Sequence, residues 1–312
     1  MMSQSTSEPL NLVVLCGPTG SGKTSLSLAL AARLPIEVIS ADSRQVYRRM
    51  DIGTAKATPA EQAAVPHHML DLIDPDQEFS VAEFVAGARP LIKEIAQRGS
   101  LPCVVGGTGL YIRALLGGLA PLPSGDPKLR KELHQREVSA GDGTLYRDLL
   151  TVDPVAAEKI HPNNLVRIVR ALEVFYLCGR RISELKSEHD FSDQPYRVLK
   201  YALGLPRSEL FARIDSRSER MLAEGLVEEV RSLVDDYSYH LKALQTLGYR
   251  EVLRFMQGEI SRQQMLEDIQ KFTRQYAKRQ LTWFRNEPEI IWVDSLTESG
   301  KVIQSIENFI LR

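Results

Sequence analysis

Cysteine is scarce in this chain of 312 residues, which has only three. Cys16, Cys103 and Cys178 are an odd number, stand far apart and lie within apolar or helical runs. This pattern is typical of reduced core thiols in a cytosolic protein, and it excludes a disulfide scaffold or a cysteine-rich metal cluster.

The sequence also lacks long apolar runs and an excess of charge of either sign. No stretch approaches the ~18 consecutive apolar residues of a membrane helix, and the first ten residues have neither a basic start nor an apolar centre. We therefore expect a cytoplasmic protein that makes no contact with a membrane. Lys and Arg number 39 against 40 Asp and Glu, a net charge of −1. Any nucleic-acid partner must then be bound by local basic patches.

The most informative segment is the octet Gly17-Pro18-Thr19-Gly20-Ser21-Gly22-Lys23-Thr24, which follows an apolar run. It matches the pattern G-x-x-x-x-G-K-[ST] between a predicted strand and a predicted helix, the setting in which this pattern binds phosphate. The glycines allow successive N–H groups to converge on an anion at the helix N-terminus. Lys23 can reach a terminal phosphate, and the Thr24 hydroxyl is placed to hold Mg²⁺. The octet predicts a diphosphate or triphosphate site without settling which compound binds.

Apolar runs alternate with helical patterns along most of the chain. Buried strands of a parallel sheet are predicted at residues 12–16, 37–40, 102–105, 198–205 and, more weakly, 290–293. Ser80-Val81-Ala82-Glu83 and Thr58-Pro59-Ala60-Glu61 are capping boxes that begin helices, and one continuous helix is expected over residues 221–234. The alternation predicts an α/β fold, a P-loop NTPase-like parallel sheet flanked by helices.

The alternation stops between residues 121 and 196, where only helical patterns occur. Asp126-Pro127 and Asp153-Pro154 each combine an N-cap with a proline at the first helical position. We interpret residues 121–196 as an all-helical insertion domain, carried on a core formed by residues 1–120 and 197–312.

Three predicted strand ends carry residues suited to chemistry, and ligands of open parallel sheets bind at those ends. The phosphate loop follows the first. Asp42-Ser43-Arg44-Gln45 follows the second, where Asp42 can be a Mg²⁺ ligand, a general base or only the cap of a turn. Gly106-Gly107-Thr108-Gly109 follows the third and indicates either close approach of a ligand or a tight turn. Gly53-Thr54-Ala55-Lys56 is a weaker signal, because loop lysines are commonly solvated.

Residues 271–285, KFTRQYAKRQLTWFR, contain five cationic and four aromatic residues and no acid. On a helix, Arg274 and Lys278 share one face, and Phe272 and Tyr276 share another. An amphipathic helix with its aromatic side chains in the core fits this pattern. In a chain of nearly zero net charge, the basic block also indicates an anionic partner, most simply a nucleic-acid backbone.

These segments together resemble the bacterial tRNA dimethylallyltransferases, also called tRNA isopentenyltransferases, along nearly the whole chain. The matching segments are residues 17–24, 40–48, 50–56, 105–111, 167–174, 247–250 and 276–285. Ala57 stands where members of this family usually have proline, which affects no residue with an expected catalytic role.

The resemblance implies transfer of the dimethylallyl group from dimethylallyl diphosphate to N6 of adenosine 37, in tRNAs that read codons beginning with U. It implies diphosphate as the second product, Mg²⁺ as cofactor and the tRNA anticodon stem-loop as partner. We expect a monomer.

The resemblance also assigns roles to individual residues. Asp42 is the expected general base, Thr19 and Thr108 line the reaction centre, and Lys23 stabilises the leaving diphosphate. The expected diphosphate-binding residues are Gly17, Pro18, Thr19, Gly20, Ser21, Gly22, Lys23 and Thr24. The expected tRNA-binding residues are Asp42, Ser43, Arg44, Gln45, Thr108, Arg130, Val166, Arg167, Ile168, Val169, Arg170, Gln245, Thr246, Leu247, Gly248, Tyr249, Arg250, Lys278, Arg279, Gln280, Leu281, Thr282, Trp283, Phe284 and Arg285.

Two other functions fit the phosphate loop. A small-molecule or nucleoside kinase would use ATP there, but it would have no obvious use for the basic and aromatic segment at 271–285. A P-loop switch or ATPase would need a second Mg²⁺ motif, an acidic residue after a run of four aliphatic ones, and we find no clear example.

Overall fold

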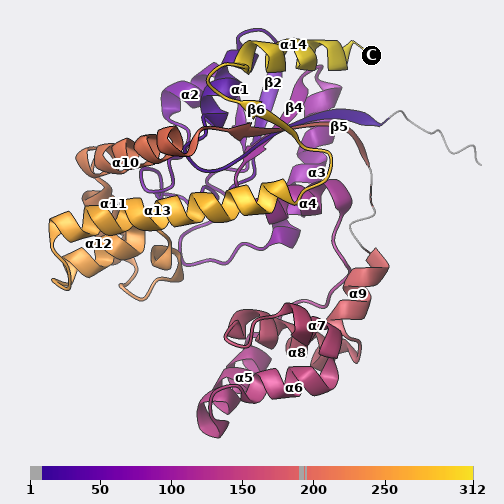
Figure 1. Cartoon of the computed structure of the whole chain (residues 1–312), viewed down its shortest axis with the longest axis vertical. Coiled ribbons are helices and arrows are strands. Elements are labelled where there is room, and N and C mark those ends of the chain that lie inside the picture. The colour runs from indigo at the N-terminus through magenta and orange to yellow at the C-terminus, as the bar shows by residue number, and fades with distance from the viewer. Residues whose placement is uncertain (1–8, 190–192, 194, 312) are drawn as a thin grey trace, which may run out of the picture. The chain divides into compact units, whose positions relative to one another are not determined.

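The computed structural model describes residues 9–189, 193 and 195–311. The chain divides into two compact units, one formed by Met1–Leu116 with Gln194–Arg312 and the other by Gly117–Asp193 (Figure 1). Among the described residues, no helix combines the length and apolar character needed to span a membrane.

The first unit is built on a six-stranded parallel sheet. Its strands are β1 (Leu10–Cys16), β2 (Ile36–Ser40), β3 (His67–His68), β4 (Leu101–Gly106), β5 (Tyr196–Gly204) and β6 (Ile291–Asp294). They lie in the order β3-β2-β4-β1-β5-β6. The predicted parallel α/β sheet is confirmed, and each of the five predicted apolar runs overlaps a strand. The expectation of a buried strand is wrong for β6, an edge strand in which Ile291 and Trp292 are exposed. The two-residue strand β3 has no apolar run, so no strand is predicted there from sequence.

Side chains that alternate along β1 fill two separate cores, because successive residues of a strand face opposite sides of the sheet. Leu12 and Val14 lie in one core, and Val13 and Leu15 lie in the other. The first core is covered by α3 (Val81–Gln97) and α4 (Gly109–Gly117), and the second by α1 (Lys23–Ala31) and α14 (Ser299–Ile310) (Figure 1). Burial on both faces explains why the strand reads as one continuous apolar run.

The remaining helices of this unit are α2 (Pro59–Ala64), α10 (Arg207–Ala223), α11 (Leu226–Asp236), η1 (Lys242–Gln245), α12 (Tyr249–Met256) and α13 (Arg262–Arg285). Both predicted capping boxes are present, at Thr58 and at Ser80. The predicted continuous helix over residues 221–234 is wrong. α10 ends at Ala223 and α11 begins at Leu226, because Gly225 between them has a φ of 103° that a helix does not accept.

The described residues of the second unit contain helices but no strand. The helices are α5 (Pro127–Ala140), α6 (Thr144–Val152), α7 (Pro154–Lys159), α8 (Leu165–Cys178) and α9 (Ile182–His189). Asp126 and Asp153 cap α5 and α7 through their side chains, each with proline at the start of the helix. Leu145, Leu149 and Leu172 lie in the core of this unit and are fully buried.

Candidate active site

The phosphate loop connects the end of β1 to the first turn of α1. Gly17, Gly20 and Gly22 have φ values of 139°, 83° and 90°, which favour glycine. A Cβ on Gly17 would also lie only 2.7 Å from the carbonyl oxygen of Leu203. Because α1 begins at Lys23, the loop ends at a helix N-terminus, whose N–H groups and dipole favour an anion.

The ammonium group of Lys23 lies against this loop. Its Nζ donates to the carbonyl oxygens of Gly17 at 3.0 Å and Pro18 at 2.8 Å. Burial lowers the pKa of Lys23 to about 8, the nearby Asp42 carboxylate counteracts this decrease, and the Arg217 guanidinium adds to it. A bound anion would therefore stabilise the charged form of Lys23.

Two cavities meet beside the phosphate loop. The larger one has a volume of about 1020 Å³ and the smaller one about 610 Å³. Both are lined by Thr19, Asp42, Thr54, Ala55, Arg217, Met221 and Tyr276. The larger cavity continues along the loop past Lys23 and Thr24, whereas the smaller one extends towards Arg44, Arg250 and Arg279. Asp42 and Thr19 thus stand where the cavity beside the phosphate loop joins a second cavity.

Asp42 follows β2, and its carboxylate both caps its own turn and lines the two cavities. Its Oδ1 accepts a hydrogen bond from the Arg44 amide at 2.8 Å, so the carboxylate does cap its own turn. It also lines both cavities and counteracts the burial that lowers the pKa of Lys23. Burial and, to a smaller extent, this carboxylate raise the pKa of Tyr276 to about 12, so the phenol is protonated at neutral pH.

Thr108 contacts the turn that carries Asp42 without lining either cavity. Its Oγ1 accepts from the Ser43 amide at 3.1 Å, and its own amide donates to the carbonyl oxygen of Ala41 at 3.1 Å. The resemblance places Thr108 at the lining of the reaction centre. Its contacts in this structure join the end of β4 to the turn after β2.

The glycines near Thr108 approach protein atoms. Added Cβ atoms would lie 2.2 Å from the Ala41 carbonyl oxygen at Gly106, 2.3 Å from Gln280 Nε2 at Gly107 and 2.0 Å from Trp283 Nε1 at Gly109. The absence of side chains lets α13 and the Ala41 backbone pack against this segment. A ligand is therefore not needed to explain these glycines.

Gln280 fastens the phosphate loop to this glycine segment. Its side chain is buried, its Oε1 accepts from the Thr19 amide at 2.8 Å, and its Nε2 donates to the carbonyl oxygen of Gly107 at 2.9 Å. Both ends of the amide are used by the protein itself, so Gln280 positions the loop.

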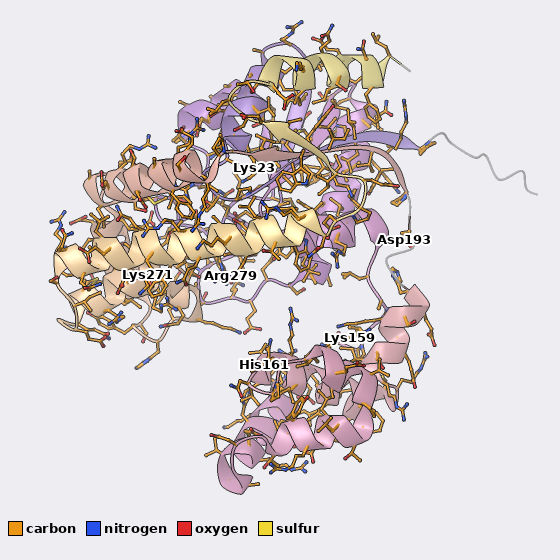
Figure 2. All side chains as sticks on the ribbon, viewed as in Figure 1. Lys23, Lys159, His161, Asp193, Lys271 and Arg279 are labelled. Carbon is orange, nitrogen blue, oxygen red and sulfur yellow. The ribbon has the colours of Figure 1, made fainter. Side chains whose placement is uncertain are left out.

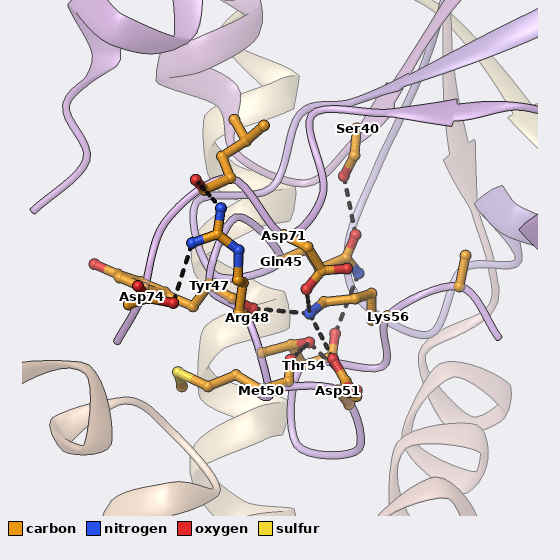
Figure 3. A network of polar contacts seen from close by, with 12 residues as sticks. Ser40, Gln45, Tyr47, Arg48, Met50, Asp51, Thr54, Lys56, Asp71 and Asp74 are labelled. Carbon is orange, nitrogen blue, oxygen red and sulfur yellow. Dashed lines mark hydrogen bonds and ion pairs between the residues drawn. The ribbon is translucent and has the colours of Figure 1, made fainter. Parts of the chain in front are cut away.

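Lys56 is buried, and the expectation of a solvated loop lysine is wrong. Its side chain is 3% exposed, and its Nζ contacts Asp51 and Asp71 at 2.5 Å each and donates to the Tyr47 carbonyl oxygen at 2.8 Å (Figure 3). Asp51 lies before α2 in the chain and Asp71 after it. Lys56 therefore holds together the two segments that flank this helix. Residues with positive φ, Arg49, Ala55, Met69 and Asp71, lie in these same segments.

Gln45 ties the same loop to the turn that carries Asp42. Its Nε2 donates to the carbonyl oxygens of Thr54 and Ala55 at 3.2 and 3.1 Å, and its Oε1 accepts from Ser40 (Figure 3). Thr54 and Ala55 line both cavities. The wall shared by the two cavities is thus held by Lys56 on one side and Gln45 on the other.

Sequence reasoning missed the arginines of α10. Arg213, Arg217 and Arg220 all line the larger cavity, and Arg217 Nη2 donates to Thr19 Oγ1 at 2.6 Å. Burial lowers the pKa of Arg217, Arg220 adds to the effect and Asp42 counteracts it. The spacing of four and then three residues places the three side chains on one helix face, and this regularity could have revealed them.

The residues assigned to tRNA differ in exposure. In the first unit the exposed ones are Arg44, Gln245, Arg250, Lys278, Arg279, Thr282 and Arg285, and the partly buried ones are Asp42, Ser43, Gln45, Thr108, Thr246, Leu247, Leu281 and Trp283. In the second unit Val166 and Arg167 are exposed, Arg130 and Arg170 are partly buried, and Ile168 and Val169 are buried.

The buried members of this set have structural contacts. Phe284 packs in the core beneath α3 and α4, Gly248 is buried at the start of α12, and the Tyr249 hydroxyl donates to Glu229 at 2.6 Å. Trp283 lies beneath the Arg113 guanidinium, 4.6 Å from its ring centroid. In this structure the side chains of Phe284, Tyr249 and Gln280 are buried and make their contacts within the protein.

The exposed basic residues of α13 are supported by aromatic rings. Lys271 and Arg279 lie along this helix (Figure 2). The Arg279 guanidinium lies 5.7 Å from the Tyr276 ring centroid, and Lys278 Nζ lies 5.7 Å from that of Phe211. The helix is thus amphipathic, with Phe284 in the core, and it also presents cations outwards.

Comparison with known families identifies the family to which the chain belongs. A model described as IPP transferase matches residues 45–287, and a model described as isopentenyl transferase matches residues 10–71. The chain belongs to the IPP transferase family. This member of the family is 52% identical over 300 residues to tRNA dimethylallyltransferase 1 of Syntrophotalea carbinolica, covering 96% of each chain.

Solved structures resemble this family member along almost its whole length. The tRNA isopentenylpyrophosphate transferase of Bacillus halodurans is 42% identical, with a TM-score of 0.71, over 96% of this chain and 95% of that one. A eukaryotic dimethylallyltransferase described as acting on tRNA is 30% identical, with a TM-score of 0.84, over 96% of this chain and 79% of that one.

Proposed function

We propose that this protein transfers the dimethylallyl group of dimethylallyl diphosphate to N6 of adenosine 37 in tRNAs that read codons beginning with U. The observation that carries the proposal is the position of Asp42, in the shared wall of a phosphate-binding cavity and a second cavity. Close relatives named tRNA dimethylallyltransferase support the same reaction.

The diphosphate of the donor is proposed to bind in the larger cavity. The N–H groups of the phosphate loop, the Lys23 ammonium and the Arg217 guanidinium supply positive charge there. When the bond between the allylic carbon and the diphosphate oxygen breaks, negative charge grows on that oxygen, and these groups stabilise it. Three arginines of α10 line this cavity, and their positive charge attracts a diphosphate more strongly than a monophosphate.

The smaller cavity is proposed to receive adenosine 37. Phe272 and Tyr276 offer aromatic surfaces, while Arg44, Arg250 and Arg279 at its lining suit a nucleic-acid backbone. A base must leave its stack to enter such a site, at a cost of a few kcal/mol. As N6 forms its bond to the allylic carbon, the Asp42 carboxylate takes the N6 proton, and diphosphate leaves on the opposite side of that carbon.

Magnesium fits the phosphate-binding cavity. Among the described residues, no cluster of three or more His, Cys, Asp or Glu side chains could hold a metal ion by itself. Mg²⁺ is commonly bound by one or two protein oxygens together with phosphates and water, and Thr24 and Asp42 both line the larger cavity. We propose that Thr24 holds Mg²⁺ with the diphosphate, where the ion would neutralise part of the negative charge.

The proposal is tested by incubating the protein with labelled dimethylallyl diphosphate, Mg²⁺ and an unmodified tRNA carrying adenosine 37. Label should appear in the anticodon loop, and replacing adenosine 37 with guanosine should abolish it. The kinase alternative is tested by thermal shift. Stabilisation by ATP, without stabilisation by the prenyl donor, would favour a kinase and contradict the proposal.

A further inference from the structure

A fully buried carboxylate in the second unit contacts two of the arginines assigned to tRNA. Glu173 lies on α8 with a side chain that is 0% exposed. Its Oε1 accepts from Arg130 Nε and from the Asp126 amide, both at 2.7 Å, and its Oε2 accepts from Arg130 Nη2 at 3.1 Å and Arg170 Nη1 at 2.5 Å. Burial alone would raise the pKa of Glu173, but these hydrogen bonds outweigh it and lower the pKa. The group is therefore an ionised carboxylate at neutral pH.

The two arginines come from different helices and are held at one place. Arg130 lies on α5 and Arg170 on α8. Arg170 Nη2 donates to the carbonyl oxygen of Pro123 at 2.7 Å, and a Cβ on Gly125 would lie 2.1 Å from Arg130 Nη2. Their side chains nevertheless remain 41% and 29% exposed. Glu173 is thus a shared anchor for two cationic side chains that reach the surface.

Further positive charge surrounds this pair. Arg167 is exposed one turn before Arg170 on α8, and Lys186 lies on α9. Burial lowers the pKa of Lys186, the charges of Arg167 and Arg170 lower it further, and Asp153 counteracts them. Arg167 and Lys186 therefore add positive charge on the side of Arg170, and Glu173 is the buried anion between Arg130 and Arg170.

We propose that Glu173 is a positioning residue for tRNA, fixing Arg130 and Arg170 so that both guanidinium groups meet phosphates of the tRNA backbone. The proposal rests on the proposed function, because it takes tRNA as the anion. Arginine side chains have high rotamer freedom, and anchoring them before binding reduces the ordering needed in the complex. The same carboxylate repels phosphate, so the two effects of Glu173 on tRNA affinity have opposite signs.

The opposite signs of these two effects of Glu173 on tRNA affinity provide the test. In Glu173→Gln, the amide can still accept from Arg130 or Asp126, but its NH₂ group faces guanidinium donors and cannot hold Arg170. We expect roughly tenfold weaker tRNA binding, equivalent to removing one charge-assisted hydrogen bond. The slope of log affinity against log salt should become shallower by about 0.7–0.9 for each phosphate that the arginines no longer meet. If Glu173 acted only through its charge, the variant would bind tRNA more tightly, and that result would overturn the proposal.

Steady-state kinetics give a second readout. Glu173 lies in the second unit and lines neither cavity. We expect Glu173→Gln to raise KM for tRNA while kcat and KM for the prenyl donor stay within about twofold of the parent protein. A decrease in kcat at saturating tRNA would contradict a role in tRNA binding alone.

Asp153→Asn is the matched control. Asp153 is a second buried acid of the same unit, and it accepts hydrogen bonds from the Ala156 amide and from Ser183. Asp153→Asn therefore reports what loosening this unit and removing one negative charge near Lys186 do to tRNA binding. Equal changes of salt slope in Asp153→Asn and Glu173→Gln would assign the effect to loosening and overturn the proposal. Glu173→Asp keeps the charge but withdraws it by one methylene, and it replaces Glu173→Gln if that variant fails to fold, with the same shallower slope expected.

Arg130→Ala and Arg170→Ala separate this proposal from the proposed function. If both variants bind tRNA as the parent protein does and still modify it, the two arginines do not contact phosphates. The positioning role of Glu173 is then wrong as well. If both weaken binding but Glu173→Gln does not, only the positioning role is wrong. Failure of the parent protein to transfer the prenyl group at all would instead refute the proposed function.

Discussion

The protonation of Lys23 should set the alkaline limit of donor binding. The pKa of this lysine is lowered from 10.5 to about 8, mainly by burial. The diphosphate site needs the charged form, whereas the neutral amine offers no ion pair. With a pKa of about 8, roughly nine-tenths of Lys23 is charged at pH 7 and one-tenth at pH 9. We therefore expect affinity for dimethylallyl diphosphate to fall about tenfold between these pH values, or about 1.4 kcal/mol.

Isothermal titration calorimetry with the prenyl donor and Mg²⁺, between pH 7 and 9.5, measures this change. The last ionisation of a phosphate group has a pKa of about 6, so the charge of the ligand is almost constant between pH 7 and 9.5. Binding should also take up close to one proton at pH 9 and about a tenth of a proton at pH 7, which titrations in buffers of different ionisation enthalpy report. The sign follows from linkage: the bound, triply charged diphosphate raises the pKa of Lys23, so the complex binds more protons than the free protein.

Two variants check that Lys23 is responsible. Arginine keeps its charge throughout this range, so Lys23→Arg should lose the pH dependence even if its affinity at pH 7 is lower. Asp42 counteracts the lowering of the Lys23 pKa, so Asp42→Asn should move the midpoint to lower pH. A donor affinity that is flat from pH 7 to 9.5, or a decrease that persists in Lys23→Arg, would refute the reasoning.

Three further predictions follow from the site. Asp42→Asn should lower the single-turnover rate by about 10²–10⁴, the usual worth of a general base, with tRNA affinity unchanged; a near-normal rate would exclude the base role. Lys278→Ala with Arg279→Ala should weaken tRNA binding and make its salt slope shallower by about 1.4–1.8; an unchanged slope would place the tRNA elsewhere. Lys56→Met should lower the free energy of unfolding by about 2–3 kcal/mol, below the usual cost of a broken buried pair because Asp51 and Asp71 are 60% and 44% exposed. Urea unfolding measures this, and Asp71→Asn in addition should recover part of the loss; a stability equal to that of the parent would show that the lysine is not anchored.

Features with local causes were predictable. The octet at 17–24 carries its own backbone requirement, because glycine adopts the left-handed conformations of a phosphate loop. Capping boxes need partners only three residues apart, and both predicted boxes formed. Apolar runs predicted the central strands β1, β2 and β4 because strands covered on both faces of a parallel sheet are apolar along most of their length.

Features that depend on distant partners were not predictable in this way. From the sequence, Lys56 is indistinguishable from an ordinary loop lysine. Only the fold places Asp71 and the Tyr47 carbonyl oxygen next to its ammonium group. Gly107 reads as a ligand contact until Gln280, at the far end of the chain, is packed against it. The sequence of α13 indicated an amphipathic helix with aromatic side chains such as Phe284 in the core, but it gave no sign that Gln280 would also be buried.

The sequence by itself determined the phosphate loop, five of the six strands and the family. It could do so because each is carried by short segments, within which the informative residues lie a few positions apart. Only the tertiary structure decided which charged side chains are buried anchors, such as Lys56 and Glu173, and which line the cavities, such as Arg217 and Arg220. The physical reason is that the cost of burying a charge is set by partners that folding brings from elsewhere in the chain.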